Sequence, residues 1–334
     1  MPSCFKPEDG DDPDSIESIL SSKGVFVLNE GNFNHGNGSL SFYSYDSFTL
    51  YNQLFYTVNQ RPLGDIPMSM IINGTKIYIV VNNSGNIEIV DKGSLKSVKT
   101  ITGLVSPRQI GIADAGKAYI TSLYSDSVAI LNLSTDNITG YIDLKKPSES
   151  IAVSSSGKAF IAHWYGGNKV MVVNTENNQV IDSIEVAAEP ESMVIDRYNL
   201  LWVLCNGGWN RQSNAELIAI NVSDHEIVRR LTFPTIDDSP TCLTIDARGE
   251  NLYYLNNGVM QLNVKAAELP AIPVIQQNNH LFYKLAVNPE NDEIFVTDAA
   301  DYQRKGYLLR FKNDGTPVSE VEADIIPGFM YFKN

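Results

Sequence analysis

The stretch from Pro107 to Leu123 reads PRQIGIADAGKAYITSL, a pattern typical of one β-hairpin. Apolar residues alternate after the proline, a turn follows at Ala115-Gly116-Lys117, and Tyr119 leads a second apolar strand. Glycine suits such a turn because it tolerates the positive φ angles that tight hairpins need. The period of two in the apolar residues indicates strands and not helices.

The same hairpin recurs along the chain, and its starts set a repeat. Segments that begin at Pro67 (PMSMIINGTKIYIVV), Pro147 (PSESIAVSSSGKAFIAH) and Pro190 (PESMVIDRYNLLWVLCN) align with it almost without gaps. A second hairpin follows in each unit, which makes four strands per unit. The starts at Pro67, Pro107, Pro147, Pro190 and Pro240 are 40, 40, 43 and 50 residues apart, and two more lie near Phe282 and at Pro327.

The two ends of the chain complete one unit. The start at Pro327 has no room for four strands, and the first strand, Gly24 to Asn29, has no strand of this kind before it. Joining them removes the exposed edge of a radial array. The sequence therefore predicts an all-β, seven-bladed β-propeller with four antiparallel strands per blade, closed by N- and C-terminal strands that share one blade. A solenoid of helices does not fit the period of two, and a sandwich has no reason to repeat every 40 or so residues.

The composition narrows the class of protein further. An apolar fraction of 43% and a charged fraction of 19% exclude an intrinsically disordered chain and a coiled coil. The net charge of −14 disfavours nucleic acid as a partner. No apolar run reaches the roughly 18 residues of a membrane helix. The three cysteines do not make a disulfide framework, and we expect Cys205 and Cys242 to be small buried residues, the alternative being a bridge between neighbouring strands.

Three strings resemble the YVTN family of β-propellers, whose units carry a strand reading Tyr-Val-Thr-Asn or close to it. They are Tyr119-Ile120-Thr121-Ser122, Phe295-Val296-Thr297-Asp298 and Tyr78-Ile79-Val80-Val81-Asn82. The resemblance covers nearly the whole chain after residue 23 and implies the propeller fold. It implies no particular function, because propellers host many unrelated activities.

The start of the chain has a different character. We expect residues 1–22 to be a disordered acidic tether and residues 23–334 to be a single propeller domain. Residues Cys4 to Asp9 are similar to the export signal of surface lipoproteins in gut Gram-negative anaerobes. This resemblance implies lipid attachment at Cys4, a place on the outer-membrane cell surface, and membrane contact only through the lipid. The alternative is that Cys4 is incidental, because no apolar segment of a signal peptide is present.

Long loops between second and third strands should share one face with the blade-to-blade loops, around the central channel. Aromatic rings beside amide groups on these loops predict a ligand-binding surface. The candidate ligand-binding residues are Phe33, His35, Tyr124, His163, Trp164, Tyr165, Trp209, Asn210, Arg211, Tyr302 and Arg304. For Trp164 and Trp209, the alternative is that they fill gaps between blades. Residues expected at the channel mouth are Arg61, Asp65, Arg108, Glu149 and Glu191.

Two functional hypotheses follow. In the first, the protein is a monomeric binding module that captures a small nutrient. A suggestive likeness to the BtuG-type vitamin B12-binding lipoproteins implies a corrinoid such as cobalamin as the ligand and a TonB-dependent outer-membrane transporter as the partner. In the second, the channel holds a metal-dependent hydrolase or lyase that uses Glu30, Glu149, Glu191 and Asp298.

No spacing typical of metal ligands or of a catalytic nucleophile occurs, so we predict no catalytic residues, no metal ion and no cofactor. His35 and His163 could approach one another on the loops, but two loop histidines are more often plain surface residues. A third hypothesis, attachment to a cell-wall glycan or a protein, uses the same face and stays open.

Overall fold

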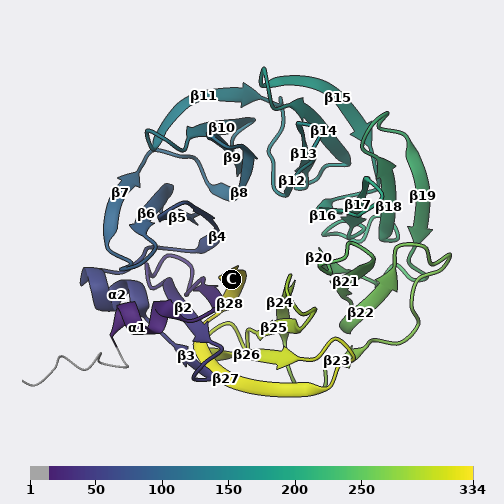
Figure 1. The fold of residues 1–334 in the computed structure, drawn as a ribbon. Helices are drawn as coiled ribbons and strands as arrows, with labels where there is room; N and C mark the ends of the chain where they lie inside the picture. Colours follow the sequence, from purple (N-terminus) through teal and green to yellow (C-terminus); the bar gives the residue numbers. More distant parts are fainter. Residues whose placement is uncertain (1–14, 334) are drawn as a thin grey trace, which may run out of the picture.

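Seven four-stranded antiparallel sheets surround a central axis in the computed structural model, which describes residues 15–333 (Figure 1). The innermost strand of each sheet lies next to the axis, and the outermost strand forms the rim of the ring. The seven-bladed β-propeller predicted from the repeat is therefore confirmed.

Strands are given below from the innermost to the outermost in each blade. Blade one contains β28 (Pro327–Lys333), β1 (Gly24–Asn29), β2 (Ser39–Ser44) and β3 (Thr49–Tyr51), and blade two contains β4 (Pro67–Asn73), β5 (Lys76–Val81), β6 (Asn86–Asp91) and β7 (Ser97–Ile101). Blade three contains β8 (Pro107–Asp114), β9 (Lys117–Ser122), β10 (Ser127–Asn132) and β11 (Asn137–Asp143), and blade four contains β12 (Ile151–Val153), β13 (Lys158–His163), β14 (Lys169–Asn174) and β15 (Gln179–Glu185). Blade five contains β16 (Pro190–Ile195), β17 (Leu200–Cys205), β18 (Glu216–Asn221) and β19 (Ile227–Thr232). Blade six contains β20 (Thr241–Ile245), β21 (Asn251–Leu255), β22 (Gly258–Asn263) and β23 (Ile275–Gln276), and blade seven contains β24 (Phe282–Val287), β25 (Ile294–Asp298), β26 (Lys305–Phe311) and β27 (Pro317–Ile325).

The connections alternate between the two faces of the ring because neighbouring strands are antiparallel. Loops from second to third strands and loops from blade to blade emerge on one face, which we call the loop face. Turns from first to second strands and from third to fourth strands emerge on the opposite face.

The core lies between the blades. The third residue of the second-strand pattern is aromatic in all seven blades, and each of these rings is at most 1% exposed. The seven residues are Phe26, Tyr78, Tyr119, Phe160, Trp202, Tyr253 and Phe295. Each ring joins a hydrophobic cluster shared with the following blade, so that seven clusters fill the seven interfaces. Burial of these large rings is therefore what holds neighbouring blades together.

Blade one is closed as the sequence predicts. Strand β28 pairs antiparallel with β1, with Gly24 opposite Lys333 and Asn29 opposite Pro327. The C-terminal strand thus supplies the innermost strand of a blade whose other strands come from the start of the chain (Figure 1).

The expected boundary after residue 22 needs a correction. Residues 16–21 form helix α1 (Ile16–Ser21), with Ser15 as its N-cap, instead of remaining outside the fold. Ile19 and Leu20 are buried in the cluster between blades one and two, with Ile16 packed against it. Apolar residues at positions i, i+3 and i+4 give the short helix one apolar face, which is why it docks on the ring. Residues 1–14, including Cys4, lie outside the described residues.

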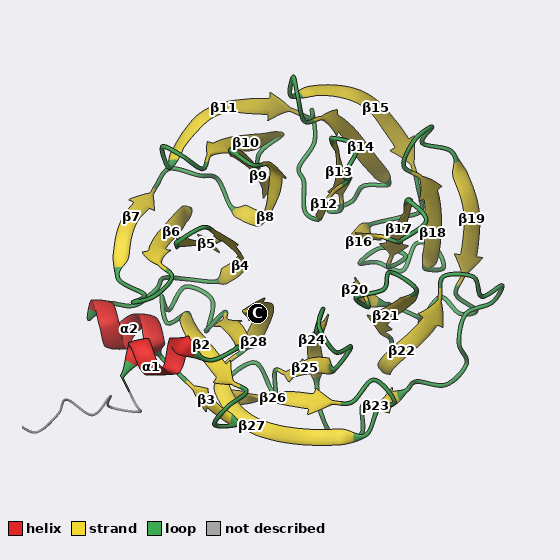
Figure 2. Ribbon diagram, in the orientation of Figure 1, coloured by secondary structure: helices red, strands yellow, loops and turns green. Residues whose placement is uncertain are grey.

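A second helix, α2 (Leu54–Asn59), links β3 to β4, and both helices lie at the outer edge of blade one (Figure 2). Within residues 15–333, no helix has the length and apolarity to cross a membrane. Cys205 and Cys242 are free thiols, so the alternative of a bridge between them is wrong. Cys205 is fully buried as expected, whereas Cys242 is only partly buried.

Candidate binding site at the channel mouth

β-Bulges at the start of the innermost strands re-aim residues near the channel mouth. Register shifts occur at the start of six of the seven innermost strands, β12 being the exception. A bulge adds one residue to a strand and re-aims its side chain. The residues near this position, one or two places after each unit start, are Met68, Arg108, Glu149 (just before β12), Glu191, Cys242, Tyr283 and Gly328, the last of which has no side chain.

The threonine of two YVTN-like strings fixes the bulges of blades three and seven. Thr121 Oγ1 accepts a hydrogen bond from the backbone N–H of Gln109 (2.9 Å) and donates one to the carbonyl oxygen of Glu149 in the next blade (2.7 Å). Thr297 Oγ1 accepts in the same way from the backbone N–H of Lys284 (3.0 Å). The repeat motif is therefore connected to the channel residues by direct bonds.

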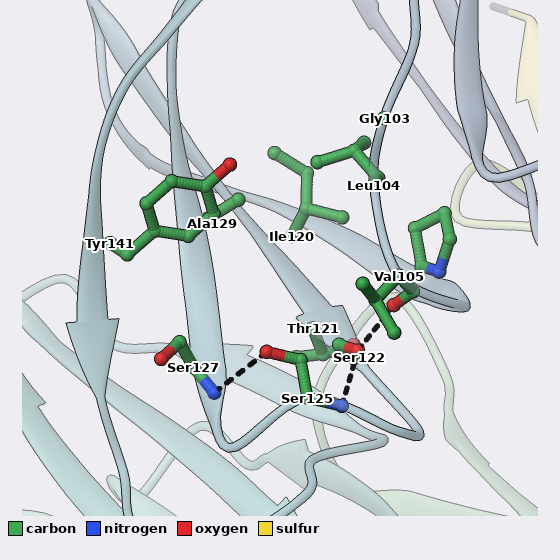
Figure 3. Close-up of a pocket in the computed structure, with 11 residues that line it drawn as sticks. Gly103, Leu104, Val105, Ile120, Thr121, Ser122, Ser125, Ser127, Ala129 and Tyr141 are labelled. Carbon is green, nitrogen blue, oxygen red and sulfur yellow. Dashed lines mark hydrogen bonds between the residues drawn. The ribbon is translucent and has the colours of Figure 1, made fainter.

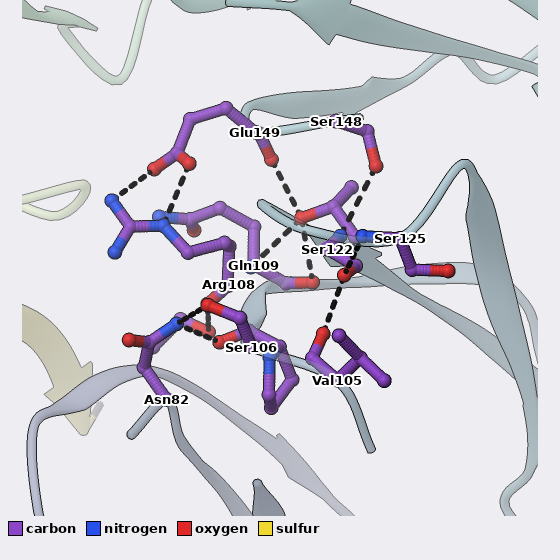
Figure 4. Close-up of polar contacts among 12 residues, drawn as sticks. Asn82, Val105, Ser106, Arg108, Gln109, Ser122, Ser125, Ser148 and Glu149 are labelled. Atoms are coloured by element: carbon purple, nitrogen blue, oxygen red, sulfur yellow. Dashed lines mark hydrogen bonds and ion pairs between the residues drawn. The ribbon is translucent and has the colours of Figure 1, made fainter. Parts of the chain in front are cut away.

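Arg108 and Glu149 form a paired charge at the mouth (Figure 4). Arg108 Nε donates to Glu149 Oε2 (2.6 Å) and Arg108 Nη2 donates to Oε1 (2.8 Å), a bidentate geometry. Both side chains are mostly buried, at 15% and 11% exposed.

A cavity of about 600 Å³ opens on the loop face above this pair. It brings together seven of the residues predicted from sequence: Arg108, Glu149, Trp164, Glu191, Trp209, Arg211 and Tyr302. A deeper cavity of about 310 Å³ shares Glu149, Glu191, Cys242 and Lys284 with it and continues along the inner strands. A neighbouring cavity of about 420 Å³ shares Arg108 and is lined by Phe33 and Tyr124.

Exposed aromatic side chains from five blades surround the mouth. The exposed fractions are 65% for Phe33, 70% for Tyr124, 63% for Tyr165, 84% for Trp209 and 43% for Tyr302. Rings held at the surface in this number are costly to leave in water, and such surfaces commonly mark sites of recognition. All five lie in loops between second and third strands, so the fold places them on the loop face.

The two loop tryptophans differ in their surroundings. Trp209 does not fill a gap between blades, because its side chain is almost fully in solvent. Trp164 is half-buried, lines the 600 Å³ cavity, and lies 6.4 Å from the ring of Tyr165. Glu189 holds the two loops, since its carboxylate accepts from the backbone N–H of Trp209 (2.9 Å) and of Gly166 (3.4 Å).

The remaining predicted residues lie apart from the 600 Å³ cavity. Its walls do not include His35, His163, Tyr165, Asn210 and Arg304. His163 is buried at the end of β13, where burial lowers its pKa. Arg61 forms an ion pair with Glu88 (2.7 Å) and does not line the three cavities at the mouth, which corrects that prediction.

Asp65 is also misplaced by the sequence prediction. Its side chain is buried beneath the loops, where Oδ2 accepts from the backbone N–H of Asn34 (2.9 Å) and from Asn83 Nδ2 (2.6 Å). It serves to hold two loops together in the way that Glu189 does.

The four carboxylates considered for metal chemistry do not converge. Asp298 accepts from His280 Nδ1 (2.7 Å), Glu30 Oε1 accepts from the Tyr283 hydroxyl (2.8 Å), and Glu191 Oε2 accepts from the Cys242 backbone N–H (2.9 Å). Glu149 is bound to Arg108, as described. Within residues 15–333, no group of three or more His, Cys, Asp or Glu side chains is arranged to hold a metal ion.

Sequence reasoning missed three residues of the mouth. Tyr283, Lys284 and Cys242 all line the 600 Å³ cavity. Burial raises the pKa of the Cys242 thiol to about 11, so the thiol stays protonated at neutral pH. A signal was present, because Tyr283, like Arg108 and Glu191, is the residue after a unit start, and Cys242 is the second residue after one.

A separate pocket of about 200 Å³ lies against blade three (Figure 3). Leu104, Ile120 and Tyr141 give it an apolar wall, and the Ser122 hydroxyl is already bound to the carbonyl oxygen of Val105. This pocket shares no residue with the 600 Å³ cavity, which carries the concentration of charged and aromatic groups.

Comparison with known proteins places the chain by family and by fold. A family model described as "Domain of unknown function (DUF5074)" matches residues 23–332. No curated protein matches the chain. Among solved structures, a quinonprotein alcohol dehydrogenase-like protein from Bacteroides thetaiotaomicron has a TM-score of 0.73 and 15% identity, covering 94% of this chain and 79% of its own.

Two enzymes have similar folds. Hydrazine synthase of Kuenenia stuttgartiensis has a TM-score of 0.68 and 15% identity, covering 80% of this chain and 92% of its own. Virginiamycin B lyase of Staphylococcus aureus has a TM-score of 0.62 and 14% identity, covering 76% of this chain and 83% of its own. At such low identity these similarities show the propeller fold alone.

Proposed function

We propose that this chain, which belongs to the DUF5074 family, is a binding protein that captures a small ring-shaped molecule on the loop face of its propeller. The observation that carries the proposal is a set of five exposed aromatic side chains on the loop face. Trp209 and Tyr302 line the 600 Å³ cavity, Phe33 and Tyr124 line its neighbour, and Tyr165 lies beside Trp164. Rigid aromatic rings bury a large area at a small cost in conformational entropy, which suits them to recognition.

The ligand class that best fits this surface is a corrinoid such as cobalamin. A corrinoid is a broad macrocycle with amide groups at its edge, so aromatic rings can stack on its face while polar groups bond its periphery. Asn206 lines the 600 Å³ cavity, and Asn82 and Asn83 line the neighbouring one. The amide nitrogens of Asn82 and Asn83 each donate to two protein acceptors, so these two side chains offer their oxygens as acceptors. The oxygen of Asn206 accepts from the Gly208 backbone N–H, so this side chain offers its amide nitrogen as a donor.

The cellular setting is part of the proposal. A protein anchored through Cys4 at the outer-membrane surface would hold the ligand, as a monomer, for a TonB-dependent transporter. Helix α1 lies at the outer edge of blade one and away from the axis (Figure 1). An anchor that leads into α1 would therefore leave the loop face open to a ligand.

Calorimetric titration with cyanocobalamin and cobinamide tests the proposal. We expect binding at one site per chain at micromolar protein. Trp209→Ala and Tyr124→Ala should each weaken binding about tenfold or more, because truncating an aromatic residue at the centre of an interface removes 1 kcal/mol or more. Neither should change the melting temperature, because both side chains are mostly in solvent.

Tyr198→Ala is the matched control. Tyr198 is 46% exposed and lies in the turn between β16 and β17, on the opposite face, so its removal should leave binding unchanged. Absence of heat with both corrinoids would exclude this ligand class. Equal binding by wild type and both loop-face variants would exclude the loop face as the site.

A further inference from the structure

Lys284 places a positive charge inside the channel without a direct partner. It is the residue after the bulge in β24 and lines both the 600 Å³ and the 310 Å³ cavities. Its Nζ lies 5.1 Å from the centroid of the Tyr283 ring. Among residues 15–333, no carboxylate oxygen lies within the 4.0 Å limit of an ion pair with this nitrogen.

The surroundings keep Lys284 charged. Burial by itself lowers the pKa of the amine, but neighbouring acidic groups, among them the carboxyl groups of Glu191 and Glu30, outweigh it, and the pKa is raised. The side chain is therefore an ammonium group at neutral pH. An ammonium group has three N–H donors and no acceptor. The side chain lines the cavity, and within residues 15–333 its Nζ makes no hydrogen bond to protein.

Arg108 adds a second donor to the same cavity. Its Nε and Nη2 are used by Glu149, whereas Nη1 has no hydrogen-bond partner in the described part of the chain. Arg108 and Lys284 also act on the same carboxyl group, because both oppose the rise that burial causes in the pKa of Glu30. The two cationic groups therefore face a common region at the floor of the cavity.

The carboxylates of the mouth are largely engaged. Glu149 is bound twice by Arg108, Glu30 accepts from the Tyr283 hydroxyl, and one oxygen of Glu191 accepts from a backbone N–H. The indole N–H of Trp164 is also buried without a partner. Within residues 15–333, three donors of the cavity wall, Lys284 Nζ, Arg108 Nη1 and the Trp164 indole N–H, thus have no acceptor, which must come from a ligand or from water.

We propose that the end of the ligand that enters the channel carries an anionic oxygen group, a carboxylate or a phosphate, which binds Lys284 Nζ and Arg108 Nη1. This inference rests on the proposed function, because it assumes that the loop face is the binding surface. The aromatic side chains then hold the ring of the ligand while the two cationic donors orient its charged end.

A pair of fluorescent probes separates the two parts of this site. 8-Anilinonaphthalene-1-sulfonate carries an aromatic ring system and a sulfonate, and N-phenyl-1-naphthylamine has the same rings without the sulfonate. We expect wild type to bind the sulfonate at one site per chain at least tenfold more tightly than the neutral probe. Lys284→Met should remove this difference and leave affinity for the neutral probe unchanged. Hydrogen bonds to charged groups are strong enough for a change of this size.

Two further variants locate the effect. Trp209→Ala should weaken both probes, because both use the aromatic surface. Lys312→Met should behave as wild type, because Lys312 is an exposed lysine in the turn between β26 and β27 on the opposite face. If Lys284→Met lowers the melting temperature, Lys284→Gln replaces it as the test, since its amide keeps a polar group in the channel.

The outcomes are distinct. If Lys284→Met binds the sulfonate as wild type does while Trp209→Ala weakens both probes, the anionic subsite is wrong and the loop-face proposal stands. If Trp209→Ala weakens neither probe, both are wrong. Displacement of the bound sulfonate by benzoate or by phenyl phosphate, in wild type but not in Lys284→Met, then shows which of the two anionic groups the site prefers.

Discussion

The hydroxyl of Thr121 accepts a hydrogen bond from a backbone N–H that a β-bulge leaves without a partner in the sheet. A bulge leaves a backbone N–H outside the ladder, and a buried N–H without an acceptor is costly. Thr121 is fully buried and bonds the N–H of Gln109 in its own blade and the carbonyl oxygen of Glu149 in the next. The same residue thus stabilises the fold and orients the Arg108–Glu149 pair.

Thr121→Val is expected to destabilise the protein by about 1–3 kcal/mol, because it keeps the shape but leaves buried polar groups unsatisfied. Urea unfolding measures the change. Thr135→Val, at an exposed position in the turn between β10 and β11, is the control and should stay within about 0.5 kcal/mol of wild type. An equal change in both variants would show that the hydroxyl of Thr121 has no special role.

At the scale of the element, the second strands of blades two, three and four are tied to the outer turn of the following blade. Lys76, at the start of β5, pairs with Asp136 in the turn between β10 and β11. The Tyr78 hydroxyl donates to the same carboxylate (2.6 Å). Lys158, at the equivalent place in β13, donates to the carbonyl oxygens of Val222 (2.9 Å) and Ser223 (2.8 Å). These polar bonds recur in three consecutive blades, whereas the aromatic rings recur in all seven.

The ion pair between Lys76 of blade two and Asp136 of blade three should make the free energy of unfolding depend on pH. Burial raises the pKa of Asp136, but Lys76, Tyr78 and Lys99 more than offset this, and the net pKa is lowered. A carboxyl group whose pKa is lowered by folding stabilises the fold above its unfolded pKa, about 4, and this contribution disappears as the pH falls through the folded value. We expect Asp136→Asn to lose about 1–3 kcal/mol at pH 7.

Chemical denaturation of wild type and Asp136→Asn between pH 7 and pH 2 checks the sign. The difference between them should be constant from pH 7 to about pH 5 and should shrink below pH 4. Asp143→Asn is the control, because Asp143 is an exposed residue whose ion pair with Lys145 lies in solvent. A difference that persists unchanged at pH 2 would contradict an ionised Asp136 as the source of stability.

At the scale of the whole molecule, the sequence was sufficient to predict the ring of seven blades and the face on which the long loops lie. The aromatic residue of each second strand and the glycine-bearing turns are local signals, and they repeat often enough to define seven blades. Side-chain partners are not local signals. The bond between Arg108 and Glu149 joins residues 41 positions apart, and only the bulges bring them together. Arg61 was misplaced for the same reason, because its partner Glu88 lies in another strand.

Helix α1 shows the other limit of sequence reasoning. Its apolar face is only three residues long and follows an acidic segment, so composition alone suggested a tether. Its docking depends on packing against Phe55 and the other residues of the first interface cluster, which come from both ends of the chain and meet only when the ring closes. Lys284 was overlooked because a lysine within an apolar strand predicts nothing until the channel around it is known.

Closure of the ring by β28 is the contact with the largest expected consequence for stability. Five residue pairs link β28 to β1, and Met330 is buried in the cluster between blades seven and one. Without β28, the inner edge of β1 would lose its backbone partners and the two adjacent clusters would be open on one side. At 0.5–1.5 kcal/mol per hydrogen bond, together with the lost apolar burial, the cost approaches the 5–15 kcal/mol of stability typical of a folded domain.

We therefore expect a chain ending at Ile326 to lose its cooperative thermal transition and to associate through the open edge, as seen by circular dichroism and size-exclusion chromatography. A circular permutant is the matched control. It keeps every strand but joins residues 333 and 23 through a short linker and starts at residue 268, in the long loop between β22 and β23. The permutant should melt cooperatively, because Gly24 and Lys333 are already paired neighbours. A truncated chain that melts like wild type would mean that six blades and an incomplete seventh hold together through their interface clusters alone.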